Sequence, residues 1–243
     1  MSNEIAISLS NVSKTYELSD RGNSFRERAL NIFTSSSVRK IQALHDVNIQ
    51  IHKGEVFGVI GHNGSGKSTL LQIMNKSIPA DRGGKVEYYG TAIRLALGMG
   101  FNPQLTARQN IFLNSSVLGL TIREIKEKFD EIVSFAELED FVDTPVKFYS
   151  SGMKSKLMFS IAVNAQADIF LMDEFFGGVG DINFQKKSEE LFRKNILQNR
   201  TIVIVSHNMS LIKQNCDRVL LLNNGIPVLI GNPEEVIKMY QSL

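Results

Sequence analysis

The chain has 243 residues, of which 43% are hydrophobic and 21% are charged, and its formal net charge is +2. This composition is ordinary for a globular protein with a sizeable core, and it gives no general drive toward nucleic acid. The single cysteine, Cys216, excludes an internal disulfide framework. The chain shows no membrane-spanning apolar run and no signal-peptide pattern at its start. We therefore expect it in the cytoplasm, or at a membrane only through a partner.

The N-terminal part predicts strands that are interrupted by a polar insertion. Residues 5–9 alternate like a strand, and residues 10–16 predict a turn and a second strand. The insertion covers roughly residues 18–42. The apolar residues that recur inside it at helical spacing are Phe25, Ala29, Ile32 and Phe33. This stripe packs either on a membrane-bound partner or on the chain's own core, and the basic charges around it suit an anionic membrane surface.

The strongest motif is a phosphate-binding loop. Residues 61–69 read Gly-His-Asn-Gly-Ser-Gly-Lys-Ser-Thr, which matches the P-loop pattern G-x-x-x-x-G-K-[ST]. The predicted nucleotide-binding residues are Gly61, His62, Asn63, Gly64, Ser65, Gly66, Lys67, Ser68 and Thr69. A predicted strand at 56–60 precedes the loop and a predicted helix follows it, as the motif requires. Lys67 would reach the β- and γ-phosphates, and the Ser68 hydroxyl would bind Mg²⁺.

The rest of the chain alternates between predicted helices and strands. The segments that predict helices are 106–120, 121–136 and 156–164, the last of them opened by residues 149–153. The segments that predict buried parallel strands are 168–172 and 201–206. A hairpin turn is predicted at residues 223–225, and a final short helix is predicted to start at Pro233.

Two carboxylates follow the predicted strand at 168–172. An apolar strand that ends in Asp-Glu is by itself typical of an ordinary strand end. In a protein that also has a P-loop, it aims the first carboxylate at Mg²⁺ and the second at the water that attacks the γ-phosphate. The sequence therefore predicts Asp173 as a metal ligand and Glu174 as a catalytic residue.

The order of these motifs resembles that of the ABC-type ATPases. After the P-loop come a Ser-x-Gly turn at residues 149–153 (Tyr-Ser-Ser-Gly-Met), the Asp-Glu pair, and a Ser-His pair at 206–207. The resemblance implies an α/β fold, a P-loop NTPase of the ABC ATPase type with an antiparallel β subdomain and a helical subdomain. We expect one domain over residues 1–243, with the helical subdomain at roughly 102–165. ATP and Mg²⁺ are the implied cofactors.

The resemblance also implies roles for residues outside the P-loop. In such ATPases the Ser-x-Gly turn of one copy clamps the γ-phosphate that a second copy holds. The residues implied in nucleotide contact are Ser150, Ser151, Gly152, Asp181 and Tyr16. Tyr16 would stack on adenine, although a core aromatic is the alternative. The implied catalytic set is Glu174, His207 and Lys67, and the implied metal ligands are Ser68, Asp173 and Gln104.

Departures from the common family pattern point to a subfamily. The turn at 149–153 differs from the usual Leu-Ser-Gly-Gly-Gln, and the loop that leads to Asp181 is longer than usual. Together with Gly-Phe-x-Pro-x-Leu-Thr-x-Arg-x-Asn at 100–110 and Val-Gly-Asp-x-x-Phe-Gln-Lys-Lys at 179–187, these features resemble the ATPases of polysaccharide and teichoic-acid exporters, the Wzt-like group. No C-terminal carbohydrate-binding domain, which some members carry, is expected within these residues.

This resemblance implies a function and a set of partners. We expect an ATP-hydrolysing subunit that drives a lipid-linked polysaccharide, of O-antigen, capsule or teichoic-acid type, across the bacterial cytoplasmic membrane. The expected partners are a second copy in a head-to-tail dimer, a permease and the glycan, with no nucleic acid, at the cytoplasmic face of the inner membrane. The alternatives are another transporter class, a non-transport ABC ATPase that acts on DNA or ribosomes, and a regulatory subunit that binds ATP without hydrolysing it.

Overall fold

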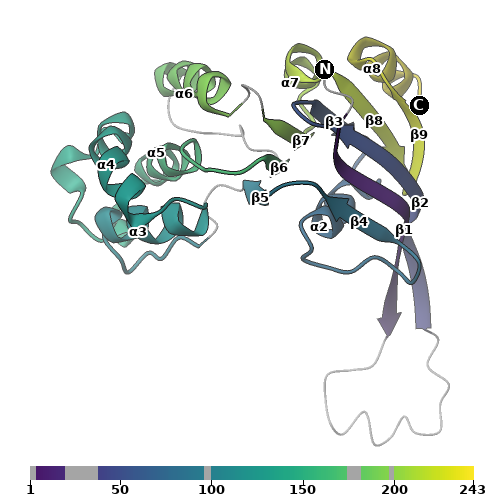
Figure 1. Ribbon diagram of the computed structural model, residues 1–243, viewed down its shortest axis with the longest axis horizontal. Coiled ribbons are helices and arrows are strands. Elements are labelled where there is room, and N and C mark those ends of the chain that lie inside the picture. Colours follow the sequence, from purple (N-terminus) through teal and green to yellow (C-terminus); the bar gives the residue numbers. More distant parts are fainter. Residues whose placement is uncertain (1–3, 20–37, 96–99, 174–181, 197–199) are drawn as a thin grey trace, which may run out of the picture.

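The computed structural model describes residues 4–19, 38–95, 100–173, 182–196 and 200–243 (Figure 1). The described strands gather at one side of the molecule and a group of helices, α3, α4 and α5, lies at the other, toward the left of Figure 1. The apolar stripe predicted within the insertion lies outside the described residues, as do Glu174 and Asp181. Among the described residues, none of the helices is both long and apolar enough to cross a membrane.

Among the described residues, one sheet consists of three antiparallel strands in the order β2-β1-β4. Its strands are β1 (Ile5–Ser19), β2 (Val38–His52) and β4 (Lys85–Tyr88). The predicted turn and second strand at 10–16 are wrong, because β1 continues through them and pairs with β2 as far as Ser19. Asn11, at φ 53°, absorbs the irregularity, and its N–H donates to Asn48 Oδ1 at 2.8 Å. The ends of the predicted insertion at 18–42 belong to these strands, because β1 runs to Ser19 and β2 begins at Val38.

A second sheet has six strands in order β5-β6-β7-β3-β8-β9, and all its neighbours are parallel except β8 and β9. Its strands are β3 (Val56–Ile60), β5 (Ala92–Leu95), β6 (Ile169–Asp173), β7 (Thr201–Val205), β8 (Arg218–Asn223) and β9 (Ile226–Gly231). The predicted strands at 56–60, 168–172 and 201–206 are confirmed, as is the hairpin turn at 223–225.

Both faces of this sheet are covered, which explains why its strands are continuously apolar. Ile169 and Leu171 of β6 pack toward the antiparallel sheet and α2 (Lys67–Met74). The alternate residues Phe170 and Met172 pack toward helices on the opposite face. Those helices include α6 (Ile182–Asn195), α7 (Met209–Asn215) and α8 (Pro233–Gln241), and α8 confirms the predicted final helix.

The helical part has its own apolar core. Its elements are α3 (Ala107–Val117), α4 (Ile122–Ala136), α5 (Ser151–Ala162) and the short 3₁₀ helices η2 (Glu139–Phe141) and η3 (Val146–Phe148). The helices predicted at 106–120 and 121–136 are confirmed, with Thr106 and Thr121 as N-caps. Helix α5 begins earlier than the predicted start at 154–156, because the Ser150 side chain accepts from Met153 N–H at 3.2 Å and caps the helix. The single domain and its helical subdomain at 102–165 stay predictions.

A buried ion pair holds the turn that leads into β3 and the P-loop. Glu55 is only 1% exposed. Its Oε2 accepts from the His52 N–H at 2.7 Å, and its Oε1 accepts from Arg218 Nη1 at 3.0 Å. The Arg218 guanidinium also lies over the Phe57 ring. One carboxylate therefore ties together the turn before β3 and the start of β8.

Replacing this carboxylate should destabilise the fold. We expect Glu55→Ala to lower the free energy of unfolding by about 2 kcal/mol, because it removes the carboxylate partner of Arg218 and leaves the His52 N–H without its acceptor. Urea unfolding followed by circular dichroism measures the change. Glu127→Ala, which removes an exposed pair with Arg123, is the control and should cost about 0.5 kcal/mol or less. Equal losses in the two variants would contradict this account.

Candidate nucleotide-binding site

Three parallel strands bring distant parts of the sequence to one edge of the sheet. Val59 of β3 pairs with Val205 of β7, and Val205 pairs with Asp173 of β6. The segments that follow these strands therefore meet at their carboxyl ends, where open α/β sheets bind ligands. A cavity of about 490 Å³ lies there. The predicted site residues that line it are Asn63, Gly64, Gly66, Lys67, Ser68, Thr69, Asp173 and His207.

Backbone carbonyls of the P-loop accept hydrogen bonds from the lysine of the same loop. Lys67 Nζ donates to the carbonyl oxygens of Gly61 and His62, both at 2.8 Å. The Ser65 N–H donates to the His62 carbonyl at 3.1 Å, which completes a tight turn. The Ser65 hydroxyl is buried and has no hydrogen-bond partner among the described residues. This arrangement places a lysine, a serine hydroxyl and the N-terminus of α2 around one concave loop, as a phosphate site requires.

Two positions in the loop accept only glycine. Gly61 has φ 154° and Gly66 has φ 101°, both in the region that disfavours side chains. A Cβ at Gly61 would lie 2.1 Å from the carbonyl oxygen of Leu222, and one at Gly66 would lie 2.5 Å from that of Ala43. The neighbouring backbone therefore approaches the loop too closely for any other residue.

The C-terminal part of the chain supports the loop from behind. The Gly225 N–H, in the β8–β9 turn, donates to the Ser65 carbonyl at 2.9 Å. The Gly225 carbonyl in turn accepts from the His45 N–H of β2 at 2.9 Å. The His62 ring lies 4.8 Å from the Tyr240 ring of α8, centroid to centroid. The shape of the P-loop thus depends on contacts with β2, the hairpin and the last helix.

His207 stands on a structured turn after β7. The Ser206 hydroxyl accepts from the Asn208 N–H at 3.1 Å. Asn208 then caps α7, because its Oδ1 accepts from the Leu211 N–H at 3.1 Å. These two bonds fix the backbone on the C-terminal side of His207, whose side chain lines the cavity. His207 therefore lines the same cavity as Lys67 and Asp173, and its predicted contact with the γ-phosphate stays a prediction.

Asp173 has an ionic partner that the sequence analysis missed. Arg94 Nη2 lies 3.4 Å from Asp173 Oδ2, and Arg94 also lines the cavity. Arg94 belongs to β5 and is paired in register with Leu171 of β6, two residues before Asp173. Its signal in the sequence is a charge within the apolar run Ala-Ile-Arg-Leu. The sequence alone does not connect this charge with the site. The pairing of β5 with β6 places Arg94 beside Asp173.

The residues present fit a magnesium-bound polyphosphate. Ser68 and Asp173 offer oxygen ligands, which Mg²⁺ prefers, and both line the cavity. In the part of the chain that the structure describes, no three His, Cys, Asp or Glu side chains form a metal cluster. A site with one carboxylate and one hydroxyl suits a Mg²⁺ ion that takes its remaining ligands from water and phosphate.

The Ser-x-Gly turn does not line this cavity. Ser150 and Ser151 are exposed, and the turn is anchored by the Tyr149 hydroxyl, which donates to the Phe141 carbonyl at 2.6 Å. Apart from its chain neighbours and the backbone of its own helix, a Cβ at Gly152 would meet only the Ser150 hydroxyl, at 3.9 Å, within the described chain. The fold of this chain therefore does not itself require a glycine there.

The predicted P-loop residues Gly61, His62 and Ser65 are not among the lining residues, and neither are Tyr16 and Gln104. Tyr16 is half-buried on β1 opposite Ile41, and its stacking on adenine stays a prediction. Gln104 is exposed, and its Oε1 accepts from Lys147 Nζ at 3.1 Å. Gln104 does not line the cavity that Ser68 and Asp173 line, and its role as a metal ligand stays a prediction.

The physical reason is the way in which the loop before α3 is held. The Asn110 amide donates to the carbonyls of Asn102, Leu105 and Thr106, at 3.0, 3.3 and 3.0 Å. Its Oδ1 accepts from the Asn102 N–H at 2.9 Å. The conspicuous motif at 100–110 therefore shapes this loop within the helical part, through the last asparagine of the motif.

The comparisons with known proteins agree with this geometry. Residues 44–177 match the family described as ABC transporter. The chain is 38% identical to the O-antigen export system ATP-binding protein RfbB of Klebsiella pneumoniae, over 98% of this chain and 98% of that protein. It is 42% identical to the teichoic acids export ATP-binding protein TagH of Lactococcus lactis over 98% of this chain, and it spans about half of that relative, 51%.

The fold comparison points the same way. An ATP-binding cassette solved as a dimer in a post-hydrolysis state with ADP and Pi superimposes with a TM-score of 0.70. The alignment covers 93% of this chain and 98% of that chain at 22% identity, so it supports the fold alone. The predicted α/β P-loop fold class and the predicted resemblance are confirmed. The chain belongs to the ABC transporter family.

Proposed function

We propose that the chain is the ATP-hydrolysing subunit of an exporter that moves a lipid-linked polysaccharide across the bacterial cytoplasmic membrane. The glycan would be of the O-antigen, capsule or teichoic-acid class. The observation that carries the proposal is the similarity to an O-antigen export ATP-binding protein over nearly the full length of both chains. The cavity with Lys67, Ser68, Asp173 and His207 supports the ATPase part, since these groups fit a magnesium-bound triphosphate.

The residues of the cavity divide the work of phosphoryl transfer. The P-loop N–H groups and Lys67 bind the phosphates, while Ser68 and Asp173 would hold Mg²⁺. When bound, Mg²⁺ neutralises charge on the phosphate oxygens. Glu174, which follows Asp173 directly, would accept a proton from the attacking water, and His207 would contact the γ-phosphate. Hydrolysis forms a bond from the water oxygen to the γ-phosphorus, and ADP leaves with the electron pair of the broken bond.

A second copy would complete each site. The exposed Ser-x-Gly turn opens α5, and it is absent from the lining of the cavity in its own chain. Its serine hydroxyl and the N-terminus of α5 suit a phosphate group. In a head-to-tail dimer each turn would face the P-loop of the other copy, with ATP between them. An integral-membrane permease would then convert closing and opening of the dimer into movement of the glycan at the cytoplasmic face of the membrane.

Gly152 offers a test of the composite site that spares the fold. We expect Gly152→Asp to fold normally, since an acidic residue is favourable in the first turn of a helix. The aspartate charge would repel the γ-phosphate of the ATP that the other copy binds. The ATPase rate should therefore fall about a hundredfold or more. Thermal melting and phosphate release measure the two effects. Arg123→Asp, which places an aspartate in the first turn of α4 and changes the net charge by two units instead of one, is the control away from the site. A Gly152→Asp variant with wild-type turnover would contradict the composite site.

Glu174 offers a test of the chemistry. We expect Glu174→Gln to retain ATP affinity and lose turnover, because the amide cannot accept the proton of the attacking water. The variant should therefore accumulate as an ATP-bound dimer, visible by size exclusion with multi-angle light scattering. Lys67→Ala is the matched control, and it should weaken ATP binding itself and give no such dimer. Turnover near the wild-type rate in Glu174→Gln would show that another group is the base.

Purification of the tagged chain from its own host in a gentle detergent tests the exporter itself. We expect a stoichiometric polytopic membrane protein to accompany the chain, identified by mass spectrometry, and Glu174→Gln to retain it. Ribosomal proteins or nucleic acid in its place, with no membrane protein, would overturn the exporter and leave the ATPase standing.

A further inference from the structure

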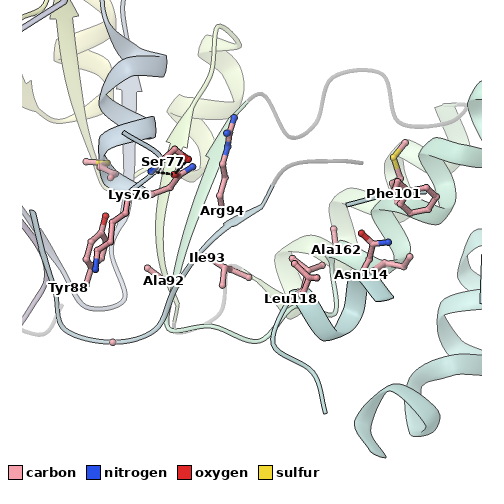
Figure 2. Close-up of a pocket in the computed structure, with 16 residues that line it drawn as sticks. Lys76, Ser77, Tyr88, Ala92, Ile93, Arg94, Phe101, Asn114, Leu118 and Ala162 are labelled. Atoms are coloured by element: carbon pink, nitrogen blue, oxygen red, sulfur yellow. Dashed lines mark hydrogen bonds between the residues drawn. The ribbon is translucent and has the colours of Figure 1, made fainter. Parts of the chain in front are cut away.

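Arg94 connects the nucleotide cavity with a second one. That cavity, of about 440 Å³, lies between the end of α2, strands β4 and β5, and helices α3 and α5 (Figure 2). Arg94 lines both cavities. Figure 2 shows its side chain extending away from Ala92 and Ile93, the neighbouring residues of β5. The guanidinium group therefore lies at the P-loop side of β5.

The strand register fixes this direction. Paired residues of neighbouring parallel strands point to the same face of the sheet, and Arg94 is paired with Leu171. Asp173, two residues after Leu171, shares that face. The resulting ion pair joins Arg94 Nη2 and Asp173 Oδ2 at 3.4 Å, and both side chains are about three-quarters buried, with exposed fractions of 30% and 25%. A pair so placed is screened less by solvent than a surface pair.

The guanidinium has bonding capacity left over. Arg94 Nε is buried and has no hydrogen-bond partner among the described residues. The ion pair with Asp173 is long for a charge-assisted hydrogen bond, at 3.4 Å. An arginine with five N–H donors in a planar fork is well suited to phosphate oxygens, which accept two parallel bonds. Arg94 thus lines the cavity with a full positive charge, and its buried Nε–H has no partner among the described residues.

That charge acts in opposite directions on the two ligands of the site. The Arg94 charge pairs with the Asp173 carboxylate, which would bind Mg²⁺, and it repels a divalent cation near that carboxylate. The same charge attracts the phosphate groups of ATP. Both effects make ATP binding depend less on Mg²⁺ than it would with Lys67 as the sole cationic side chain near the phosphates.

We propose that Arg94 is a positioning residue for the nucleotide, which holds Asp173 before Mg²⁺ arrives and contacts a phosphate group of ATP. The proposal rests on the magnesium-ATP site proposed above and adds to it a cation that reduces the dependence of ATP binding on Mg²⁺. Arg94 and Lys67 would both bind the phosphate groups, from different elements. Lys67 is the first residue of α2, and Arg94 belongs to β5.

The test is equilibrium binding of methylanthraniloyl-ATP, followed by fluorescence, in EDTA and in excess Mg²⁺. The quantity of interest is the ratio of the two dissociation constants, EDTA over Mg²⁺. We expect Arg94→Gln to raise this ratio about tenfold, because ATP loses a cation and Mg²⁺ loses a repulsion. Arg94→Lys keeps the charge but loses the planar fork, so its ratio should lie closer to that of the wild type than the ratio of Arg94→Gln does. Arg108→Gln, which removes an exposed pair with Asp143 in the helical part, is the control and should leave the ratio unchanged.

Each contrary result has a distinct meaning. A ratio in Arg94→Gln within about twofold of wild type, or an equal rise in Arg94→Lys, would overturn the role of the Arg94 charge. Equal ATP binding with and without Mg²⁺ in both the wild-type protein and Arg94→Gln would overturn the magnesium site itself, and this inference with it. If Arg94→Gln does not fold, the Arg94 Nε–H signal of the wild-type protein is measured by NMR on addition of ATP in EDTA. A shift supports the contact, and an unchanged signal overturns it.

Discussion

Parallel pairing of β3, β6 and β7 is the constraint on which the site depends. The registers that join Val59 to Val205 and Val205 to Asp173 make three separate strands end at one edge of the sheet. These strands are buried on both faces, so their interiors are apolar and polar side chains are concentrated where each strand ends. The chemistry therefore lies at the edge where the backbone leaves the sheet. No local contact in the sequence could bring Lys67, Asp173 and His207 together.

The conformation of the P-loop depends on tertiary contacts as well as on its own sequence. Its glycine positions are fixed by the carbonyls of Leu222 and Ala43, and its Ser65 carbonyl accepts a bond from Gly225. These partners come from β8, β2 and the β8–β9 turn. The loop is thus held on several sides by the rest of the chain, and a preorganised loop loses little conformational entropy on binding phosphate.

The sequence predicted the features that depend on short-range pattern and left out those that depend on pairing. Buried strands and the P-loop were predictable because apolar period and glycine spacing are local properties. The continuity of β1 was not, since the bulge at Asn11 is stabilised by Asn48 across the sheet. The family resemblance implied Gln104 as a metal ligand, which stays a prediction, whereas the fold places Arg94 beside Asp173. Which polar side chain reaches a carboxylate is decided by strand register, which the sequence does not show.

The charges around the cavity also bear on how two copies would close. Lys67, Arg94 and the N-terminus of α2 outweigh the single carboxylate of Asp173 among the described residues that line the cavity. In the proposed dimer, the N-terminus of α5 from the partner would approach this excess of positive charge. A bound triphosphate, which stays anionic even with Mg²⁺, attracts both positive ends. This attraction would favour closure of the proposed dimer around ATP, and the loss of phosphate would weaken it.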